Sequence, residues 1–488
     1  MSSRGPAALG SVLALVALVA LVACSRDTSS GDPEPGPATD TWKPTPGAWQ
    51  PGEPLETTRG ALARGLVERK GLVHAHSVYS HDACDGKPID ENGNIDRTCL
   101  DQFRKALCDA KLDFVFLTDH RGAFADHEFP DVVLHDAARG DRLEEGGRAN
   151  WATCTGRDPV MVMAGTESGT APVGLEEHVA GTPKQRYDAY GEKTAASIEA
   201  FKKAGAVSLV VHPEEWGVEP LVTLPIDGFE MYNLHANAFL GLGALLGIIN
   251  HLQNPDEIAR LPHPDLFFVP VVTEDPRYLA IWGSVLARGV KRFTTMGTDC
   301  HRNSFPQITP DGERIDSYRR MMGWFSNHLL VRPDAGGAWN DRSLKDALRG
   351  GRLFGTFDVL GPVKGFDFHA REGEAAAVGA VPVLHEMGDE VSLAKGATLH
   401  VDVPVLDRLD PAATAPTITA RILRAKEGGW DVVATSSTSI DFPVTSAGAY
   451  RAEIRMVPRH LEHYLGESAE LARSGDFVWV YGNAIYVK

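Results

Sequence analysis

The stretch GLVHAHSVYSHDACDG, residues 71–86, holds three histidines and two aspartates in sixteen positions. His74 and His76 stand two apart in its apolar part. Side chains two apart on a β-strand point to the same side, so both imidazoles would face one point while Val73 and Ala75 face away. Such a pair belongs either to a metal centre or to an ordinary core, and the rest of the chain bears on that choice.

Other apolar segments also end in residue types that bind metals, and helix-like segments such as 99–111 and 194–206 lie between them. These apolar segments are 112–122 with Asp119 and His120, 159–169 with Glu167, 205–217 with His212, 227–235 with Glu230, and 292–303 with Asp299 and His301. Apolar strands that alternate with helices predict a parallel sheet. Because functional side chains of an α/β barrel gather at the C-terminal ends of its strands, we expect these residues to converge on one rim.

Histidines are concentrated at these strand ends. A single buried histidine there is more often a hydrogen-bonded structural residue than a ligand. Buried polar groups without partners are costly, however, and coordination of a metal removes the cost for many of them at once. The joint pattern therefore predicts a metal centre. The histidines concerned are His74, His76, His81, His120, His178, His212 and His301.

The motifs, taken in order, resemble a known superfamily. Within residues 70–355 the chain carries His-x-His, YSHD, LTDH, GTE, HP and GTDCH. Together these resemble the PHP (polymerase and histidinol phosphatase) superfamily of metallophosphoesterases. Amidohydrolase barrels also open with His-x-His, but the TDH and GTDCH elements favour PHP. The resemblance implies a distorted (β/α)7 barrel that binds two or three divalent metal ions.

The resemblance also implies a set of ligands. His74, His76, Glu167 and Asp299 would hold a first metal, Glu167 would bridge to a second metal held by His178 and His212, and His81, His120 and His301 would hold a third. The superfamily commonly has Ser-Asp-Gly where this chain has Ser80-His81-Asp82, so the ligand is His81 or Asp82, and the register favours His81. We expect Asp119 to orient His120. The neighbouring histidines expected to take no part are His127, His135 and His235.

Histidine-rich ligands with few carboxylates suit zinc, manganese or iron. Two or three divalent ions would bring more positive charge than the carboxylates of Glu167 and Asp299 neutralise. The site is therefore expected to be positively charged and to attract phosphate. Bound metal yields hydroxide near neutral pH, which predicts hydrolysis of a phosphoester by a metal-bound hydroxide, with Glu167 and Asp299 as catalytic residues. Arg121 and Arg302 each follow a ligand motif directly. They would either clamp phosphate oxygens or be ordinary surface arginines.

Residues 1–23 are predicted to be a lipoprotein signal peptide. Arg4 precedes an apolar run that ends in Leu-Val-Ala-Cys, as in secretory signals. This ending resembles a bacterial lipobox, which implies a lipidated Cys24 and an exported periplasmic or outer-membrane lipoprotein; the alternative is an uncleaved membrane anchor. Residues 24–55, rich in Pro, Gly, Ser and Thr, are predicted to form a disordered tether.

Disulfides are plausible in an exported protein. Cys84 and Cys99 bracket a polar, turn-rich loop that a disulfide suits. Cys108 and Cys154 are then the second pair by elimination, and Cys300 is expected to stay a free thiol.

Two domains are predicted. Residues 56–355 form the PHP metallohydrolase barrel, and residues 356–488 form a small antiparallel β-sandwich-like domain, because short strands separated by turns fill that part. The closing VWVYGNAIYVK resembles an ending of some bacterial PHP proteins, with Ala484 where they have proline.

The net charge of −17 argues against a broad nucleic-acid surface. The leading hypothesis is an exported metal-dependent phosphoesterase, held at a membrane through lipidated Cys24 and acting on a small-molecule or cell-surface phosphoester. The alternatives are a metal-dependent hydrolase of another bond, such as an amide or lactone, and a non-catalytic metal-binding surface lipoprotein.

Overall fold

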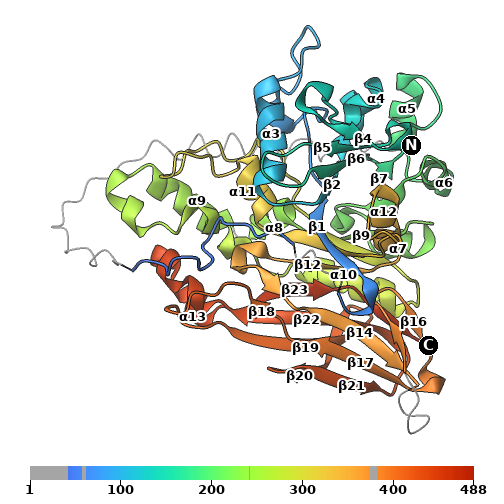
Figure 1. Ribbon diagram of the computed structural model, residues 1–488, viewed down its shortest axis with the longest axis vertical. Coiled ribbons are helices and arrows are strands. Elements are labelled where there is room, and N and C mark those ends of the chain that lie inside the picture. Colours follow the sequence, from blue (N-terminus) through green and yellow to red (C-terminus); the bar gives the residue numbers. More distant parts are fainter. Residues whose placement is uncertain (1–41, 58–61, 241, 374–381) are drawn as a thin grey trace, which may run out of the picture. The chain divides into compact units, whose positions relative to one another are not determined.

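A run of short buried strands forms the sheet that carries the predicted ligands (Figure 1). The structure, a computed structural model, describes residues 42–57, 62–240, 242–373 and 382–488, so the predicted signal peptide and Cys24 lie outside the described residues. In sheet order the strands are β1 (Val67–Val73), β2 (Phe114–Phe116), β6 (Val160–Glu167), β7 (Ala171–Leu175), β8 (Val207–Val210), β9 (Gly228–Asn233) and β10 (Phe293–Gly297). Neighbours pair in parallel, except that β7 is antiparallel to β6 and β8.

These strands are buried along most of their length, as expected for a sheet covered on both faces. Gly71 in β1 is required by close packing, because a Cβ there would lie 2.3 Å from the carbonyl oxygen of Phe114. The apolar runs of the sequence thus become buried strands, and their polar residues follow at the strand ends.

The two ends of this run of strands meet just beyond β1 and β10. Ala75 and Cys300 form a parallel bridge. The backbone N–H of Asp299 donates to the carbonyl oxygen of His74 at 3.2 Å, and that of His76 donates to Cys300 at 3.2 Å. The chain therefore has a mixed α/β fold with a large mixed sheet, and complete closure into the predicted distorted (β/α)7 barrel stays a prediction.

Helices cover these strands; the helix-like segments 99–111 and 194–206 are α3 and α6. The helices are α2 (Ala83–Gly86), α3 (Arg97–Asp109), α4 (Arg121–Asp126), α5 (Pro183–Tyr190), α6 (Ala195–Lys203), α7 (Val218–Thr223), α8 (Leu234–Leu240), α9 (Leu242–Leu252), α10 (Pro276–Ala287), α11 (Tyr318–Gly323), α12 (Asp341–Arg349) and α13 (Glu470–Ser474). Capping boxes begin α6 and α12. Helix α6 packs on β7 and β8, and α12 packs on β8 and β11.

Further strands continue the sheet from β1 into the C-terminal part. β1 pairs with β11 (Ser326–Val331), β11 with β12 (Leu353–Thr356), and β12 with β23 (Phe477–Gly482), all antiparallel. The predicted domain boundary at 355/356 thus falls inside β12, and Trp42–Lys488 is one compact unit. The hydrogen bonds between β12 and β23 join the two predicted domains. The sequence could not predict this pairing, because backbone hydrogen bonds between distant strands have no residue pattern of their own. The short strands β3 (Asp119–His120) and β5 (Ala149–Ala152) pair with β6, and β4 (Arg142–Leu143) pairs with β5.

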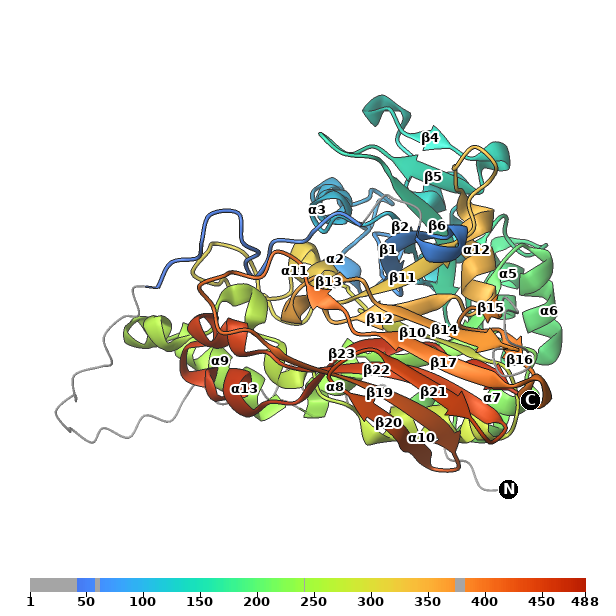
Figure 2. The same cartoon turned by 60° about the horizontal axis from the view of Figure 1, so that its bottom comes forward.

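The C-terminal strands are antiparallel, as predicted, apart from one short parallel pair (Figure 2). β22 (Gly448–Val457) pairs with β19 (Thr417–Lys426), β23 and β24 (Ile485–Val487), β19 pairs with β20 (Gly429–Ser436), and a second sheet has the order β15 (Val383–His385), β14 (Asp367–Glu372), β17 (Ala397–Asp402) and β21 (Ile440–Val444). The short strands are β13 (Val363–Lys364), β16 (Glu390–Val391) and β18 (Val405–Leu406). Burial alternates along β14 and β17, as in a sheet with one covered face. Leu399 of β17 belongs to the same apolar core as Ile422 of β19.

The predicted disordered tether over 24–55 is wrong for residues 42–55. Trp49 is buried, and its backbone N–H donates to the carbonyl oxygen of Arg408 at 2.8 Å. The ring of Trp42 stacks on His463 with centroids 4.7 Å apart. The average composition hides these two tryptophans, whose apolar surface offsets the entropy lost when the segment packs.

Both predicted disulfides are confirmed. Cys84 is bonded to Cys99, and Cys108 to Cys154. Cys300 is a buried free thiol. None of the described helices combines the length and the apolar character that a membrane crossing requires.

Replacing Trp49 by alanine should destabilise the protein by about 3 kcal/mol, because a large buried side chain leaves a cavity. Urea unfolding measures the change, and an unchanged denaturant slope serves as the control that both proteins unfold alike. A loss well below about 1 kcal/mol would show that residues 42–55 contribute little to the fold.

Candidate metal centre

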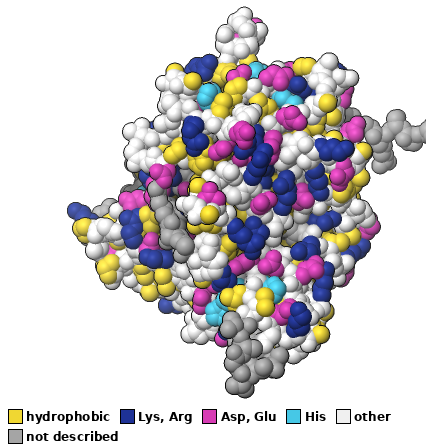
Figure 3. Space-filling model, turned by 45° about the vertical axis from the view of Figure 1, so that its right-hand side comes forward, with side chains coloured by type: hydrophobic (Ala, Val, Ile, Leu, Met, Phe, Trp, Pro, Cys, Tyr) yellow, Lys and Arg dark blue, Asp and Glu magenta, His cyan; other side chains and the backbone are white. Residues whose placement is uncertain are grey.

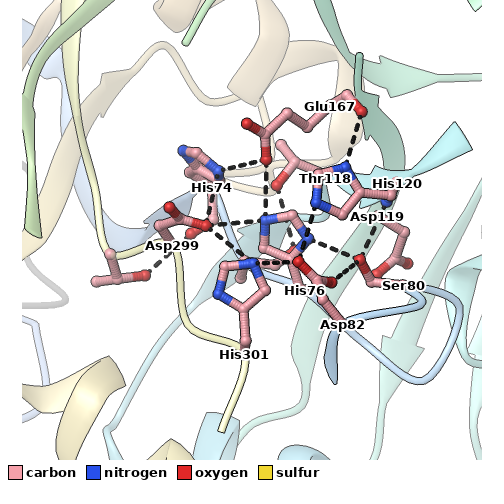
Figure 4. Close-up of polar contacts among 12 residues, drawn as sticks. His74, His76, Ser80, Asp82, Thr118, Asp119, His120, Glu167, Asp299 and His301 are labelled. Atoms are coloured by element: carbon pink, nitrogen blue, oxygen red, sulfur yellow. Dashed lines mark hydrogen bonds and ion pairs between the residues drawn. The ribbon is translucent and has the colours of Figure 1, made fainter. Parts of the chain in front are cut away.

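Residues from three strand ends form a first group of possible ligands (Figure 4). Ligand atoms of His74, His76, Glu167 and Asp299 all lie within 4.8 Å of one another. Nε2 of His74 lies 3.0 Å from Oε2 of Glu167, and Nε2 of His76 lies 3.2 Å from the same oxygen. Nε2 of His76 also lies 3.1 Å from Oδ1 of Asp299. The His-x-His pair therefore faces one point, as predicted, although β1 ends at Val73 and both histidines lie just beyond it.

A second group shares His76 with the first. It consists of His76, Asp82, His120 and His301, whose ligand atoms meet the same distance limit. Oδ2 of Asp82 lies 3.0 Å from Nε2 of His120 and 3.1 Å from Nε2 of His301. The rings of His76 and His301 are stacked with centroids 4.0 Å apart. The two groups thus adjoin one another at His76, and Oδ1 of Asp299 in the first group also lies 3.2 Å from Nε2 of His301 in the second.

His212 lies at the border of the first group, and Glu230 contacts His74 on the side of the ring away from the other ligands. Nε2 of His212 lies 3.2 Å from Oε1 of Glu167 and 3.4 Å from Oδ2 of Asp299. Glu230 is fully buried, and its Oε1 lies 2.8 Å from Nδ1 of His74. A carboxylate behind a ligand histidine fixes the direction of its ring. The sequence showed Glu230 on a strand beside the predicted ligands, but nothing there revealed its contact with His74.

The backbone is strained at three of these positions. His74, His212 and Asp299 have φ values of 149°, 49° and 51°, in the region that favours glycine. Conformations of this kind cost on the order of 1–3 kcal/mol each and persist where the surroundings enforce them. Here each sharp turn follows a strand closely and leaves its side chain at the common rim.

Burial and charge set the protonation of the first group. Burial, together with the nearby His301, lowers the pKa of His76, so this ring is neutral near pH 7. Burial alone would lower the pKa of His74 as well, but surrounding carboxylates, above all Asp299, raise it well above its ordinary value. Burial opposes ionisation of Glu167, yet neighbouring histidines hold its pKa well below the usual range. The Glu167 carboxylate therefore stays negative and favours a bound cation.

The second group shows the same balance. Burial opposes the charge on His120, but Asp82 and Glu167 outweigh it and raise the pKa of His120 to about 9. Burial also opposes ionisation of Asp82, whereas His120 and His301 hold the pKa of Asp82 far below its usual range.

The donor set fits divalent transition-metal ions. His76 is fully buried and neutral, and its Nε2 faces two carboxylates. Mixed imidazole and carboxylate donors suit zinc, manganese or iron better than calcium or magnesium. Among the described residues, two groups of side chains could hold a metal ion.

The structure places Asp82, and not His81, among the possible ligands. His81 is exposed and lies outside both groups, with its ring 4.8 Å from that of His120. His178 is not a ligand in this arrangement either. Its Nδ1 lies 3.0 Å from the Tyr190 hydroxyl, and its Nε2 lies 2.7 Å from the carbonyl oxygen of His127. Both ring nitrogens are therefore engaged away from the centre.

The expectation that Asp119 orients His120 is wrong. The Asp119 carboxylate accepts hydrogen bonds from the backbone N–H and hydroxyl of Ser77, at 2.5 and 2.7 Å. Burial raises the pKa of Asp119 to about 7. Nδ1 of His120 instead lies 3.3 Å from the backbone oxygen of Glu167. Asp119 thus fastens the turn that follows His76.

The remaining predicted residues lie around the centre. The guanidinium of Arg121 lies 4.2 Å from the ring centre of Tyr187 and donates to that residue's carbonyl oxygen at 3.1 Å. Arg302 is 3.7 Å from Asp85. His127 bonds to the carbonyl oxygen of Ala123 at 2.8 Å. His135 is in neither group, and the side chain of His235 is outside the described residues.

Comparisons with known proteins add one likeness. No protein-family model matches this chain, and no curated protein matches it either. Among solved structures, the chain is similar to a two-domain protein from Bacteroides vulgatus ATCC 8482 described as containing a predicted PHP-like metal-dependent phosphoesterase. The match covers 88% of this chain and 98% of that chain, with 13% identity and a TM-score of 0.30.

Replacing Asp82 by alanine should remove about one transition-metal ion per chain, since this carboxylate lies between two histidines of the second group. Replacing the neighbouring His81 by alanine is the matched control and should leave the metal content unchanged. Elemental analysis of both variants, after reloading with zinc or manganese, measures the difference. The reverse pattern would return the ligand role to His81.

The metal-free protein should lose stability as the pH rises from about 7 to 9. Folded His120 keeps its proton up to about pH 9, whereas an unfolded histidine releases it near 6.5. Its ion pair with Asp82 therefore stabilises the fold fully below pH 6.5 and is lost as the pH passes the folded value.

Urea unfolding of chelator-treated protein at a series of pH values measures this loss. The variant His120→Gln should flatten the profile between pH 7 and 9. Equal slopes for the variant and the parent protein would contradict the assignment.

Proposed function

We propose that this chain is a metal-dependent phosphoesterase of the PHP superfamily. The observation that carries the proposal is the pair of ligand groups that share His76. Two adjoining ion sites suit displacement at phosphorus, where both the attacking and the leaving oxygen need stabilisation. The ordered motifs of the sequence support the superfamily assignment.

Glu167 has the central position in this proposal. Its Oε2 contacts His74 and His76, while its Oε1 contacts His212. One carboxylate thus reaches imidazoles on two sides and would hold metal through either oxygen. Asp299 lies beside it and contacts His76 and His301. Bound divalent ions would lower the pKa of water and neutralise phosphate charge.

The centre is partly open to solvent. The side chains of His120, Asp82 and His212 are 28%, 26% and 25% exposed, whereas those of His74 and His76 are fully buried. Structural zinc sites are closed by four protein ligands. A partly open centre supports catalysis over a purely structural metal site.

We propose that the substrate is an anionic phosphoester drawn in by the ions themselves. On the face shown in Figure 3, basic and acidic side chains are interspersed, without a broad basic area. Arg121 and Arg302 lie next to ligand residues, and we propose that they contact the phosphoester after leaving Tyr187 and Asp85. Whether the substrate is a small molecule or a cell-surface group, the same charge would bind it.

We also propose export and lipid attachment at Cys24. The support is the signal-like sequence of residues 1–24, together with the two disulfides, which suit an oxidising compartment. The site would then act in the periplasm or at the outer membrane of a bacterium.

Replacing Glu167 by alanine should reduce phosphoester hydrolysis by at least about a hundredfold, because loss of the bridge misplaces the reacting groups. The matched control is His178→Ala, which removes a nearby histidine whose nitrogens are bonded elsewhere and should keep activity within a few-fold. Turnover of a generic phosphoester, metal content and circular dichroism are measured together.

Inorganic phosphate should inhibit the parent protein. Hydrolysis of an amide or lactone without inhibition by phosphate would replace the phosphoester assignment. Failure to hydrolyse any substrate with zinc, manganese or iron would favour a non-catalytic metal protein.

A further inference from the structure

Helix α10 lies between the candidate metal centre and the C-terminal strands. On one side it contacts β9 and the single turn η6 (Pro213–Glu215), which follows His212 directly. On the other side it contacts β19, β20 and β22. Figure 1 shows the helix at this boundary. Contacts on both sides allow α10 to relay the position of one part to the other.

A short chain of hydrogen bonds leads from α10 to His212. The hydroxyl of Tyr278, which is buried, donates to Oε2 of Glu214. The other oxygen of Glu214 lies 3.4 Å from Nδ1 of His212. Nε2 of His212, on the far side of the ring, faces Glu167 at 3.2 Å. A ligand histidine usually gives its second nitrogen to a carboxylate, which sets the ring direction.

His212 depends on such support more than the histidines of the first group do. The side chains of His74 and His76 are fully buried, whereas that of His212 is 25% exposed. The backbone of His212 is also in the left-handed region, with φ 49°. Glu214 lies on the same turn, so it can hold the imidazole only if something outside the turn holds Glu214. Tyr278 is that outside contact.

The C-terminal strands fix α10 next to Tyr278. The indole N–H of Trp430 donates to the carbonyl oxygen of Leu279 at 3.2 Å, and the backbone N–H of Gly428 donates to the hydroxyl of Ser284 at 2.8 Å. The backbones themselves touch, because a Cβ on Gly283 would lie 1.9 Å from the carbonyl oxygen of Gly429. The helix therefore cannot slide along its axis without breaking these contacts.

Charged residues hold the same helix at two further points. The guanidinium of Arg451 lies 4.6 Å from the ring centres of both Trp282 and Trp430, a cation–π arrangement. Arg455 donates to Glu274 at 2.8 Å, immediately before Asp275, whose side chain caps the start of α10. These contacts favour one position of the helix.

We propose that the C-terminal strands position His212 at the metal centre, acting through α10, Tyr278 and Glu214. This inference rests on the proposed metal-dependent function and gives the C-terminal strands a part in it. Tyr278 is a positioning residue that touches neither metal nor substrate. A purely structural helix would affect stability alone, whereas this arrangement affects one ion selectively.

The first test is Tyr278→Phe in the full-length chain, stripped of metal and titrated with Co²⁺ by absorption spectroscopy. Loss of the hydroxyl should weaken binding of one ion by about tenfold or more, as for other residues that orient ligands. The control Tyr450→Phe removes another buried hydroxyl, which donates to Ser446 at 2.7 Å within the C-terminal part, and should leave Co²⁺ binding unchanged. Normal binding by Tyr278→Phe would overturn the inference.

A double variant separates positioning from general destabilisation. His212→Ala should weaken the same ion, and adding Tyr278→Phe to it should cause little further change, because the tyrosine acts only through that imidazole. An equal loss in both backgrounds would show that Tyr278 acts through overall stability and would overturn the proposal.

The link to the C-terminal strands is tested by Trp430→Leu, which should weaken the same ion several-fold. The control is Trp339→Leu. Trp339 packs against Arg69 and Trp151, which lie outside α10. A folded Trp430→Leu variant with parental affinity would overturn this link. A parent protein that binds no Co²⁺, Zn²⁺ or Mn²⁺ would instead refute the proposed function, and the inference with it.

Discussion

The contacts between two carboxylates and the surrounding imidazoles are the constraint on which the rest of the centre depends. Glu167 and Asp299 place negative charge against histidines that are largely withdrawn from water. Neither set of groups would be stable there alone, because buried charge and buried unpaired nitrogen are both costly. The site is therefore built as a whole, and a cation can take the place of the protons that these histidines otherwise hold.

This requirement explains the strained strand ends. A strand carries its side chains alternately to its two faces, so a strand that simply continued would not turn a ligand toward the rim. Sharp left-handed turns at His74, His212 and Asp299 follow their strands closely. The bridge between Ala75 and Cys300 then joins the ends of β1 and β10. The residues of the short sequence motifs thus both turn the backbone at the strand ends and supply the ligand atoms.

The sheet continues from β1 through β12 into β23, so the C-terminal strands are not an appendage. They share hydrogen bonds with the strands of the centre and pack on α10 from the other side. His212 lies on a partly exposed turn, where local packing alone cannot fix its ring. Contacts from α10 and the C-terminal strands can supply the missing support. This arrangement connects the stability of the C-terminal part with the geometry of the site.

The sequence by itself determined those features that arise from neighbours along the chain. The two-residue spacing predicted that His74 and His76 face one point, apolar runs marked the strands that lead to Glu167 and Asp299, and cysteine positions indicated both disulfides. Only the tertiary structure decided the partners of residues on loops. It placed Asp82 rather than His81 in the centre, turned His178 toward Tyr190, brought Glu230 behind His74 and packed residues 42–55 on the body. The physical reason is that a loop side chain meets groups distant in sequence, so its contacts depend on the path of the whole chain and not on residue spacing.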